Sequence, residues 1–301
     1  MWCKQGLIFA PNKNHWWSQD YALLPTVEVI NDVIRVYFAS LDNNKFGRIG
    51  FVDLDPQNPR SILNTSHEPI LNIGEPGSFD DSGVNPSCII NVSGKKFLYY
   101  IGWQRCVKVP YMLFSGLAIS SNGTNFEKHG NVPILDRKND EPFSRSAPFI
   151  IKESEIFKMW YWSCVKWTRT NQSIHYNNVI KYATSLDGIN WSVNPNISIS
   201  PNFINEYSVG RPCVIKDNQI YKMWYSIRSH NEPYKIGYAE SVDGIDWIRK
   251  DEEVGISRSQ VGWDSEMICY PCVIDVNGKR YMFYNGNKHG STGFGYAVWN
   301  G

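Results

Sequence analysis

The stretch Arg211-Pro-Cys-Val-Ile-Lys-Asp-Asn-Gln-Ile-Tyr-Lys-Met-Trp-Tyr225 decides the fold, because the chain contains it more than once. A near copy is Ala147-Pro-Phe-Ile-Ile-Lys-Glu-Ser-Glu-Ile-Phe-Lys-Met-Trp-Tyr161. The first copy continues into Ile236-Gly-Tyr-Ala-Glu-Ser-Val-Asp-Gly-Ile-Asp-Trp247, and the second into Ile180-Lys-Tyr-Ala-Thr-Ser-Leu-Asp-Gly-Ile-Asn-Trp191. Self-similarity of this length indicates that one structural unit is used repeatedly along the chain.

Looser copies extend the repeat to the whole chain. They begin at Leu24-Pro, Asn85-Pro and Tyr270-Pro, so that each unit carries one marker proline. The markers are separated by 61, 62, 64 and 59 residues, and they are Pro25, Pro86, Pro148, Pro212 and Pro271. The sequence therefore predicts five units of similar length.

Each unit has the pattern of a small antiparallel sheet. The proline is expected to open a short apolar strand, where its missing N–H is tolerated. A polar turn such as Asn277-Gly278 follows, then an aromatic strand, a Gly-Tyr-Ala strand, a Ser-x-Asp-Gly turn and a fourth strand. Four short strands per unit with hairpin spacing and no helical period predict an all-β fold, a five-bladed β-propeller with four-stranded blades.

The two ends of the chain predict how the ring closes. The fifth unit stops after its third strand, at 295–301, whereas residues 2–11 resemble the fourth strand of the other units. We therefore expect the N-terminal strand to join the last blade, which leaves no open sheet edge. The whole chain, 1–301, is predicted to be a single domain.

Composition excludes several classes of partner. Thirty Lys and Arg against 29 Asp and Glu give a net charge of +1, so no basic field is available for nucleic acid. No run of about 18 apolar residues occurs, so we expect no membrane insertion. The start of the chain lacks a basic segment followed by an apolar one, and the seven cysteines are scattered. These features favour a cytoplasmic protein with neither metal nor cofactor.

The Ser-x-Asp-Gly turns are expected to have a structural role and not a catalytic one. Asp187 and Asp243 recur in them at the same position, next to a glycine. Asp-Gly is a hairpin signal because both residues tolerate a positive φ. We therefore interpret these aspartates as turn residues on the outer rim.

Acidic residues that differ between units mark the candidate catalytic site. In a propeller the first strand of each blade lines the central axis, so residues just before the marker prolines should meet there. Asp20, Asp81 and Glu266 stand five residues ahead of their prolines, and Glu206 stands six ahead. Converging carboxylates suit glycosidic chemistry, in which one protonates the leaving oxygen and another assists water or the cationic transition state. We predict these four residues to be catalytic.

Residues closer to the prolines are predicted to bind the substrate. Arg145 and Arg211 are suited to an anionic group on the ligand, although ion pairs with the same carboxylates are an equally good interpretation. Trp103 is suited to stacking on a sugar ring, with blade core as the alternative. The full set of expected binding residues is Asn85, Trp103, Arg145, Arg211, Tyr270 and His289.

The repeat also resembles a known superfamily. Pro-x-Val-Ile, the aromatic strand and Gly-Tyr-Ala-x-Ser-x-Asp-Gly-x-x-Trp are similar to the five-bladed propeller glycoside hydrolases, which include arabinanases, invertases and mannoside phosphorylases. The segments 79–86, 98–103, 262–266 and 284–287 resemble uncharacterised bacterial members associated with polysaccharide gene clusters. The resemblance implies a base on blade one, a tuning Asp on blade two and an acid on blade three. Asp20 and Asp81 match the first two by position, blade three offers Phe143 with Glu141 off register, and Glu266 has no counterpart.

Residues and resemblance together predict a carbohydrate-active enzyme that is glycoside hydrolase-like. Its expected partner is a carbohydrate or sugar-nucleotide ligand, such as an intracellular oligosaccharide or an activated sugar. Two alternatives remain open at this point. One is a sugar-binding propeller without catalysis, and the other is a glycoside phosphorylase or transferase in surface-polysaccharide biosynthesis. The sequence does not determine the oligomeric state.

Overall fold

The computed structural model describes residues 1–11, 13–169 and 174–301, and nearly all of its regular structure is β-strand. The all-β prediction is confirmed. The strands form antiparallel groups in chain order. The first group is β2 (Asp20–Ile30), β3 (Val33–Leu41), β4 (Gly47–Leu54) and β5 (Ile62–Thr65), and the second is β6 (Gly83–Val92), β7 (Lys95–Arg105), β8 (Tyr111–Ser120) and β9 (Glu127–Lys128).

The remaining groups repeat the same order of strands. The third is β10 (Arg145–Glu153), β11 (Ile156–Arg169), β12 (Ile174–Ser185) and β13 (Ser192–Ile199), and the fourth is β14 (Glu206–Asp217), β15 (Ile220–Ser229), β16 (Lys235–Ser241) and β17 (Ile248–Arg249). The last contains β18 (Cys269–Val276), β19 (Lys279–Asn285) and β20 (Phe294–Trp299), and β1 (Trp2–Phe9) pairs antiparallel with β20. The helical segments are η1 (Asp251–Glu253) and α1 (Asn287–Gly290).

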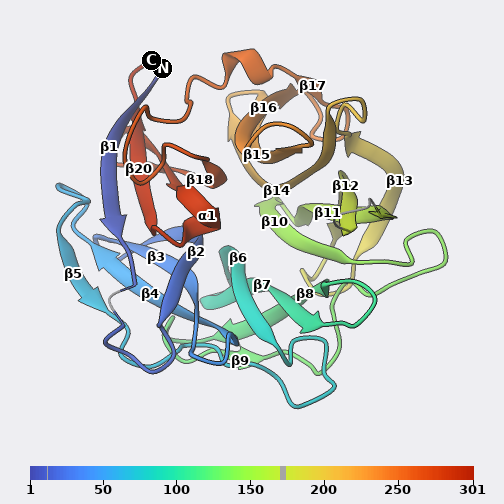
Figure 1. Ribbon diagram of the computed structural model, residues 1–301, viewed down its shortest axis with the longest axis horizontal. Coiled ribbons are helices and arrows are strands. Elements are labelled where there is room, and N and C mark those ends of the chain that lie inside the picture. Colours follow the sequence, from blue (N-terminus) through green and yellow to red (C-terminus); the bar gives the residue numbers. More distant parts are fainter. Residues whose placement is uncertain (12, 170–173) are drawn as a thin grey trace.

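The first strands of these groups surround a common centre, as Figure 1 shows. Strand β2 contacts both β6 and β18, β10 contacts β6 and β14, and β14 contacts β18. Single parallel bridges also link neighbouring groups, for example Asn178 with Ser208 and Gly47 with Gly83. The inner strands are therefore the elements from which a central site can be built.

The marker prolines lie inside the inner strands and do not open them. Strand β14 begins at Glu206, well before Pro212, and its pairing with β15 shifts register between Gly210 and Cys213. In the other inner strands a register shift also lies across the marker proline or begins at it. The prediction that proline starts the strand is wrong, because a bulge within the strand also tolerates a residue without an N–H.

The Ser-x-Asp-Gly turns hold neighbouring groups together. In the fourth group the Ser241 hydroxyl accepts the Gly244 N–H at 2.8 Å, and the Gly244 carbonyl accepts the indole N–H of Trp160 from the third group at 2.7 Å. The Tyr99 hydroxyl donates to the Gly188 carbonyl in the same way, at 2.9 Å. The interpretation of these turns as scaffold agrees with this geometry, because their polar groups are used locally or by the adjacent group.

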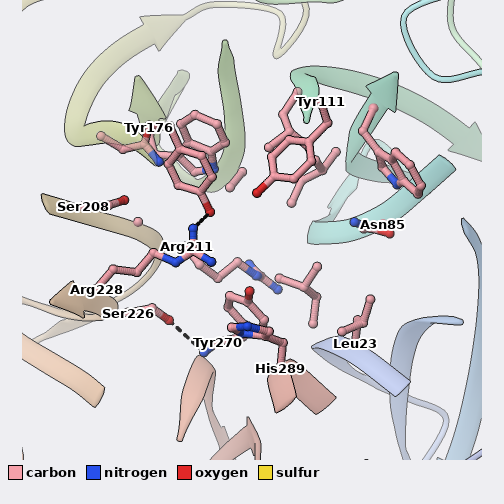
Figure 2. Close-up of a pocket in the computed structure, with 18 of the residues that line it drawn as sticks. Leu23, Asn85, Tyr111, Tyr176, Ser208, Arg211, Ser226, Arg228, Tyr270 and His289 are labelled. Atoms are coloured by element: carbon pink, nitrogen blue, oxygen red, sulfur yellow. Dashed lines mark hydrogen bonds between the residues drawn. The ribbon is translucent and has the colours of Figure 1, made fainter. Parts of the chain in front are cut away.

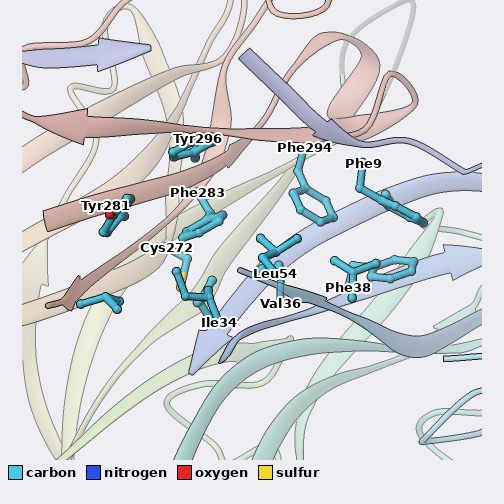
Figure 3. Packing of buried hydrophobic residues seen from close by; sticks show 14 of the residues in the cluster. Phe9, Ile34, Val36, Phe38, Leu54, Cys272, Tyr281, Phe283, Phe294 and Tyr296 are labelled. Carbon is cyan, nitrogen blue, oxygen red and sulfur yellow. The ribbon is translucent and has the colours of Figure 1, made fainter. Parts of the chain in front are cut away.

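The cores lie between neighbouring groups of strands. Between the first and last groups, Phe38, Phe283 and Phe294 are fully buried, together with Val36 and Leu54, as Figure 3 shows. Each such side chain contributes roughly 1.5–3 kcal/mol through removal from water. Within the described residues, no helix is long and apolar enough to cross a membrane.

Candidate functional site

A cavity of about 430 Å³ lies where the inner strands converge. Residues from all the strand groups line it, and Figure 2 shows several of them pointing into the same space. The polar and aromatic residues of the lining are Tyr21, Asn85, Trp103, Tyr111, Trp162, Tyr176, Asn178, Ser208, Arg211, Ser226, Arg228, Tyr234, Tyr270 and His289. Among the described lining residues there is no Asp or Glu.

The residue before each marker proline faces this cavity. These residues are Leu24, Asn85, Ala147, Arg211 and Tyr270, and all of them belong to the lining. All but Asn85 have a positive φ, between 47° and 56°. A non-glycine residue in this conformation costs on the order of 1–3 kcal/mol, and such strain is concentrated at functional sites. The bulge therefore has a specific consequence, which is to turn one side chain per group toward the centre.

Arg211 is a buried cation that no acidic side chain among the described residues neutralises. It is 3% exposed, and its guanidinium donates to the Ser87 carbonyl at 2.6 Å and to the Thr26 hydroxyl at 2.8 Å. Its Nε is buried without a hydrogen-bond partner, and among the described residues no carboxylate forms an ion pair with it. Burial lowers the pKa of Arg211. A buried charge without a counter-ion is costly, so an anion in the cavity would relieve it.

Arg228 brings a second guanidinium to the same cavity. It donates to the Tyr176 hydroxyl, and it lies close to two aromatic rings, 4.6 Å from the ring centre of Tyr176 and 4.4 Å from that of Tyr234. Its Nε is also buried without a partner. Contacts with these rings hold the guanidinium in place without neutralising it. The two arginines therefore give the cavity a positive potential.

Amide and indole groups supply neutral contacts. Asn85 and Asn178 each have a buried side-chain oxygen that lacks a hydrogen-bond partner, and both line the cavity. The indole of Trp103 lies directly over Gly83, where a Cβ would come within 2.1 Å of the ring nitrogen. Glycine is needed there because any side chain would push this indole away. Amide oxygens beside flat aromatic surfaces are the groups that bind sugar hydroxyls and sugar faces.

Tyr270 and His289 complete the lining on the side of the last strand group. The backbone N–H of Tyr270 donates to the Ser226 hydroxyl at 2.8 Å, which ties β18 to the preceding group. The His289 ring packs edge-on against Tyr234, with ring centres 5.0 Å apart, and its Nδ1 is buried without a partner. Burial, followed by the nearby charge of Arg228, lowers the pKa of His289 to about 4.

Most of the predicted binding residues meet in this cavity, and Arg145 does not. Asn85, Trp103, Arg211, Tyr270 and His289 all line it. Arg145 is 4% exposed and forms an ion pair with Glu141 at 3.1 Å, while Lys181 lies 3.5 Å from the same carboxylate. The cavity-lining residue of that strand is Ala147, directly before Pro148. Arg145 thus takes part in a buried ion cluster, and its carboxylate partner is Glu141 rather than one of the four predicted catalytic acids.

The four predicted catalytic carboxylates lie outside the cavity lining, and three of them already have partners for their side chains. Asp20 pairs with Lys45 at 2.5 Å, and Asp81 accepts hydrogen bonds from the Gly77 N–H and the Ser82 hydroxyl. Glu206 is 8% exposed and receives two hydrogen bonds from Arg249. The Glu266 side chain is exposed, and its backbone N–H donates to the Asn287 side chain. Their catalytic role stays a prediction.

Several lining residues were not predicted from the sequence, among them Tyr111, Trp162, Tyr176, Asn178 and Arg228. A signal for Arg228 was present in the repeat. The third residue after the aromatic triplet of each second strand is Leu41, Trp103, Cys164, Arg228 or Asn287. Leu41, Trp103 and Arg228 of this set line the cavity. The residue at this position differs between the units, whereas the aromatic residues before it recur. This difference marks the position as part of a candidate site.

Comparisons with known proteins identify the class of fold. A glycosyl hydrolase from Bacteroides ovatus superposes with a TM-score of 0.76, at 15% identity over 100% of this chain and 94% of that chain. A second solved structure comes from the GH130 family of mannoside phosphorylases, which contains glycoside hydrolases that target β-1,2-mannosidic linkages in Candida mannan. It superposes with a TM-score of 0.74, at 16% identity over 100% of this chain and 94% of that chain. The chain therefore has the fold of the propeller glycoside hydrolase-like superfamily, as its resemblance to that superfamily predicted.

Sequence comparison places the chain within a narrower family. Uncharacterized protein MT1551 of Mycobacterium tuberculosis (strain CDC 1551 / Oshkosh) is 39% identical over 298 residues, which is 99% of this chain and 98% of that protein. Uncharacterized protein Rv1502 of the same species (strain ATCC 25618 / H37Rv) is 38% identical over 298 residues, with the same coverage. The chain belongs to the family of these two proteins. No protein-family model matches it.

Proposed function

We propose that this protein is a carbohydrate-active, glycoside hydrolase-like protein that binds an anionic sugar derivative in the central cavity. The observation that carries the proposal is the pair Arg211 and Arg228, which face one cavity while no described acidic side chain lines it. Guanidinium groups recognise phosphate and carboxylate groups through paired N–H donors. The ligand class that fits is a sugar carrying such a group, including an activated sugar.

The proposed architecture is one domain, 1–301, formed by a five-bladed propeller in which β1 completes the last blade. Antiparallel pairing of β1 with β20 and the contacts among the inner strands support it. In this arrangement one residue from every blade lines the cavity, where all of them can reach a single ligand. The pre-proline positions would then select the ligand, since they differ in every unit while their surroundings repeat.

Each part of the cavity has a distinct task in this proposal. The amides of Asn85 and Asn178 hydrogen-bond sugar hydroxyls, and Trp103 offers a flat face to the ring. Arg211 and Arg228 hold the anionic group. Catalysis by Asp20, Asp81, Glu206 and Glu266 would require these carboxylates to reach the reacting bond from the rim, because they do not line the cavity.

We place the protein in the cytoplasm, acting on an intracellular oligosaccharide or activated sugar in glycan assembly. All seven cysteines are free, including the exposed Cys3 and Cys106. Exposed thiols persist in the reducing environment of the cytosol. The resemblance to bacterial propellers associated with polysaccharide gene clusters supports a role in surface-polysaccharide biosynthesis.

A sugar-binding protein without catalysis is the second candidate. It is favoured by the partners of Asp20, Asp81 and Glu206, which leave these carboxylates engaged in other contacts. A phosphorylase or transferase would use the same arginines for a phosphate-bearing reactant. The three activities therefore predict the same binding site and differ in the product.

The test is a screen of aryl glycosides, sugar phosphates, uronates and sugar nucleotides, each with and without inorganic phosphate. Wild type is compared with Arg228→Gln, Glu266→Gln and Asp81→Asn. A carbohydrate-active enzyme gives a product from a charged substrate, with a marked loss in Arg228→Gln. Binding without product, unchanged in both carboxylate variants, would instead establish the second candidate.

A matched control separates charge recognition from folding. Arg60 is exposed and donates to the backbone carbonyl of Gln5 in the outer strand β1, outside the cavity lining. Arg60→Gln removes an arginine of the same chain without touching the cavity, so ligand binding should be retained. Equal losses in Arg60→Gln and Arg228→Gln would refute an anion site in the cavity.

A further inference from the structure

His289 is held in the cavity wall by an unusual backbone. It lies in α1, where both Lys288 and His289 have left-handed conformations, with φ of 51° and 61°. The following residue is Gly290, whose φ is 100°. Successive non-glycine residues in this region are strained, and such strain persists only where the surroundings enforce it.

The neighbours of α1 explain how that conformation is enforced. The buried Asn287 donates to the Gly262 carbonyl at 3.0 Å and accepts the Glu266 N–H at 2.7 Å. The backbone N–H of His289 donates to the Met267 sulfur at 3.3 Å. The segment is thus fastened to the preceding loop, and the imidazole is presented to the cavity as Figure 2 shows.

The imidazole has a nitrogen available for a proton. Nδ1 is buried and has no hydrogen-bond partner, although a buried polar atom is normally paired. The ring lines the cavity and rests edge-on against Tyr234. A buried, unpartnered nitrogen in a cavity wall indicates a group whose partner is supplied by the ligand or its proton.

The charged side chains that line the cavity with His289 are both cations. Arg228 acts on it directly, and Arg211 lines the same cavity, together with the phenols of Tyr234 and Tyr270. Strand β2 also packs against α1, and its two acids, Asp20 and Glu28, are already paired with Lys45 and Lys96. Lys288 and Glu266 are both exposed. Burial and the charge of Arg228 therefore keep the pKa of His289 near 4, and the empty site holds a neutral imidazole at neutral pH.

We propose that His289 takes up a proton from solvent when an anionic ligand occupies the cavity beside Arg228. This inference rests on the proposed function, because it needs an anion in the same cavity. The incoming negative charge offsets the guanidinium and favours the imidazolium form. The bound complex then contains an acid beside the ligand, supplied by the cavity wall itself rather than by a rim carboxylate.

Linkage makes the proposal measurable. A ligand that raises the affinity of His289 for a proton is itself bound more tightly when the proton is present. Anion affinity should therefore rise as pH falls from the bound-state pKa toward about 4, the value in the free protein. A neutral sugar lacks this dependence because it does not change the charge near the imidazole.

The experiment is an NMR titration of the histidine side chains with sulfate as the probe. Sulfate imitates a phosphate group and does not itself titrate at these pH values. The chain has six histidines, so His289→Asn assigns the signal. Asparagine is chosen because it tolerates the left-handed backbone. We expect sulfate to raise the pKa of His289 by about one unit or more, and Arg228→Gln to abolish the response.

Two other readouts complete the test. The exposed His129 is the internal control, and its titration should not respond to sulfate. The indole N–H signals of Trp103 and Trp162, which line the cavity, report whether sulfate enters. If these signals shift and the pKa of His289 does not, the inference is wrong while the anion site stands. If neither responds, both the inference and the anion site are overturned.

Discussion

Arg145 and Arg211 lie in neighbouring strand groups with closely similar sequences, and both are almost fully buried. Arg145 pairs with Glu141 at 3.1 Å and stands three residues before its marker proline. Arg211 stands directly before Pro212, lines the cavity and has no acidic partner among the described residues. The difference shows that burial of a charge does not by itself indicate function. The presence or absence of a counter-ion separates a structural cation from one that awaits a ligand.

The same distinction applies to the carboxylates. Buried acids in several groups accept a hydrogen bond from the tyrosine of the aromatic strand and pair with a cation. Tyr100 donates to Asp80, which pairs with Lys128 at 2.7 Å. Tyr284 donates to Asp264, which pairs with Lys4 at 2.6 Å. These acids stabilise the scaffold, whereas the described residues that line the cavity include no Asp or Glu.

The largest effect is expected when the structural pair is broken. Glu141→Gln leaves Arg145 and Lys181 without their shared anion in a buried site. Removing one partner of a buried pair typically costs about 3–5 kcal/mol. We expect a loss of this order in the free energy of unfolding, measured by urea denaturation. Glu155→Gln is the control, because the Glu155 side chain is 91% exposed, and a similar loss there would contradict the account.

The next effect concerns the unpaired cations. Arg228→Gln should change stability little, because the loss of its contacts with aromatic rings and a phenol is offset by the removal of a charge that has no acidic partner among the described residues. It should weaken binding of an anionic ligand roughly 10- to 100-fold, as a charged hydrogen bond contributes about 1.5–3 kcal/mol. This affinity is measured by calorimetric titration with the charged ligand that the substrate screen identifies. An unfolding free energy that falls as far as in Glu141→Gln would remove the contrast between the two kinds of arginine.

A smaller effect is expected in the pH dependence of stability. The pKa of His289 is lowered from 6.5 to about 4 in the folded protein. The unfolded chain therefore binds a proton that the folded chain refuses, so stability is lost as pH falls between these values. The contribution is at most about 1.4 kcal/mol per pH unit. Urea denaturation across this range gives the free energies of unfolding of wild type and His289→Asn, and the stability of wild type relative to the variant should fall toward low pH. A difference that stays constant with pH would contradict the lowered pKa.

The smallest effect concerns strain at the pre-proline bulge. Ala147 has a φ of 47° and lines the cavity. Ala147→Gly should raise the free energy of unfolding by up to about 1 kcal/mol, because glycine adopts this conformation without strain. Ala118, buried in the regular strand β8, offers the matched control, where glycine should destabilise. Destabilisation at both positions would mean that the bulge is not strained.

The fold class was predictable because the repeat is long and specific. The copies at 147–161 and 211–225 fix the strand order, and the Asp-Gly turns mark hairpins. The bulges were not predictable, since a proline pattern alone does not distinguish the start of a strand from an irregularity within it. Without the bulge, the acids five or six residues earlier were expected to reach the cavity together with the pre-proline residues, and the structure places only the pre-proline residues in its lining.

The binding residues were partly predictable for the same reason. Asn85, Arg211 and Tyr270 were found because they directly precede their prolines. Arg145 was grouped with them although it stands two residues too early, and the counter-ion that separates it from Arg211 is a tertiary contact. Arg228 and Asn178 come from other strands, and only the alignment of the second strands could have identified Arg228.

The most direct test of the central claim compares charged and uncharged ligands of the same shape. Hexose 1-phosphates and uronates are titrated beside the matching free hexoses into wild type and Arg228→Gln. We predict that the tightest ligand is charged, that its free hexose binds at least about tenfold more weakly, and that Arg228→Gln removes this difference. Equal affinity for the charged and uncharged members of each pair would contradict an anion-binding cavity.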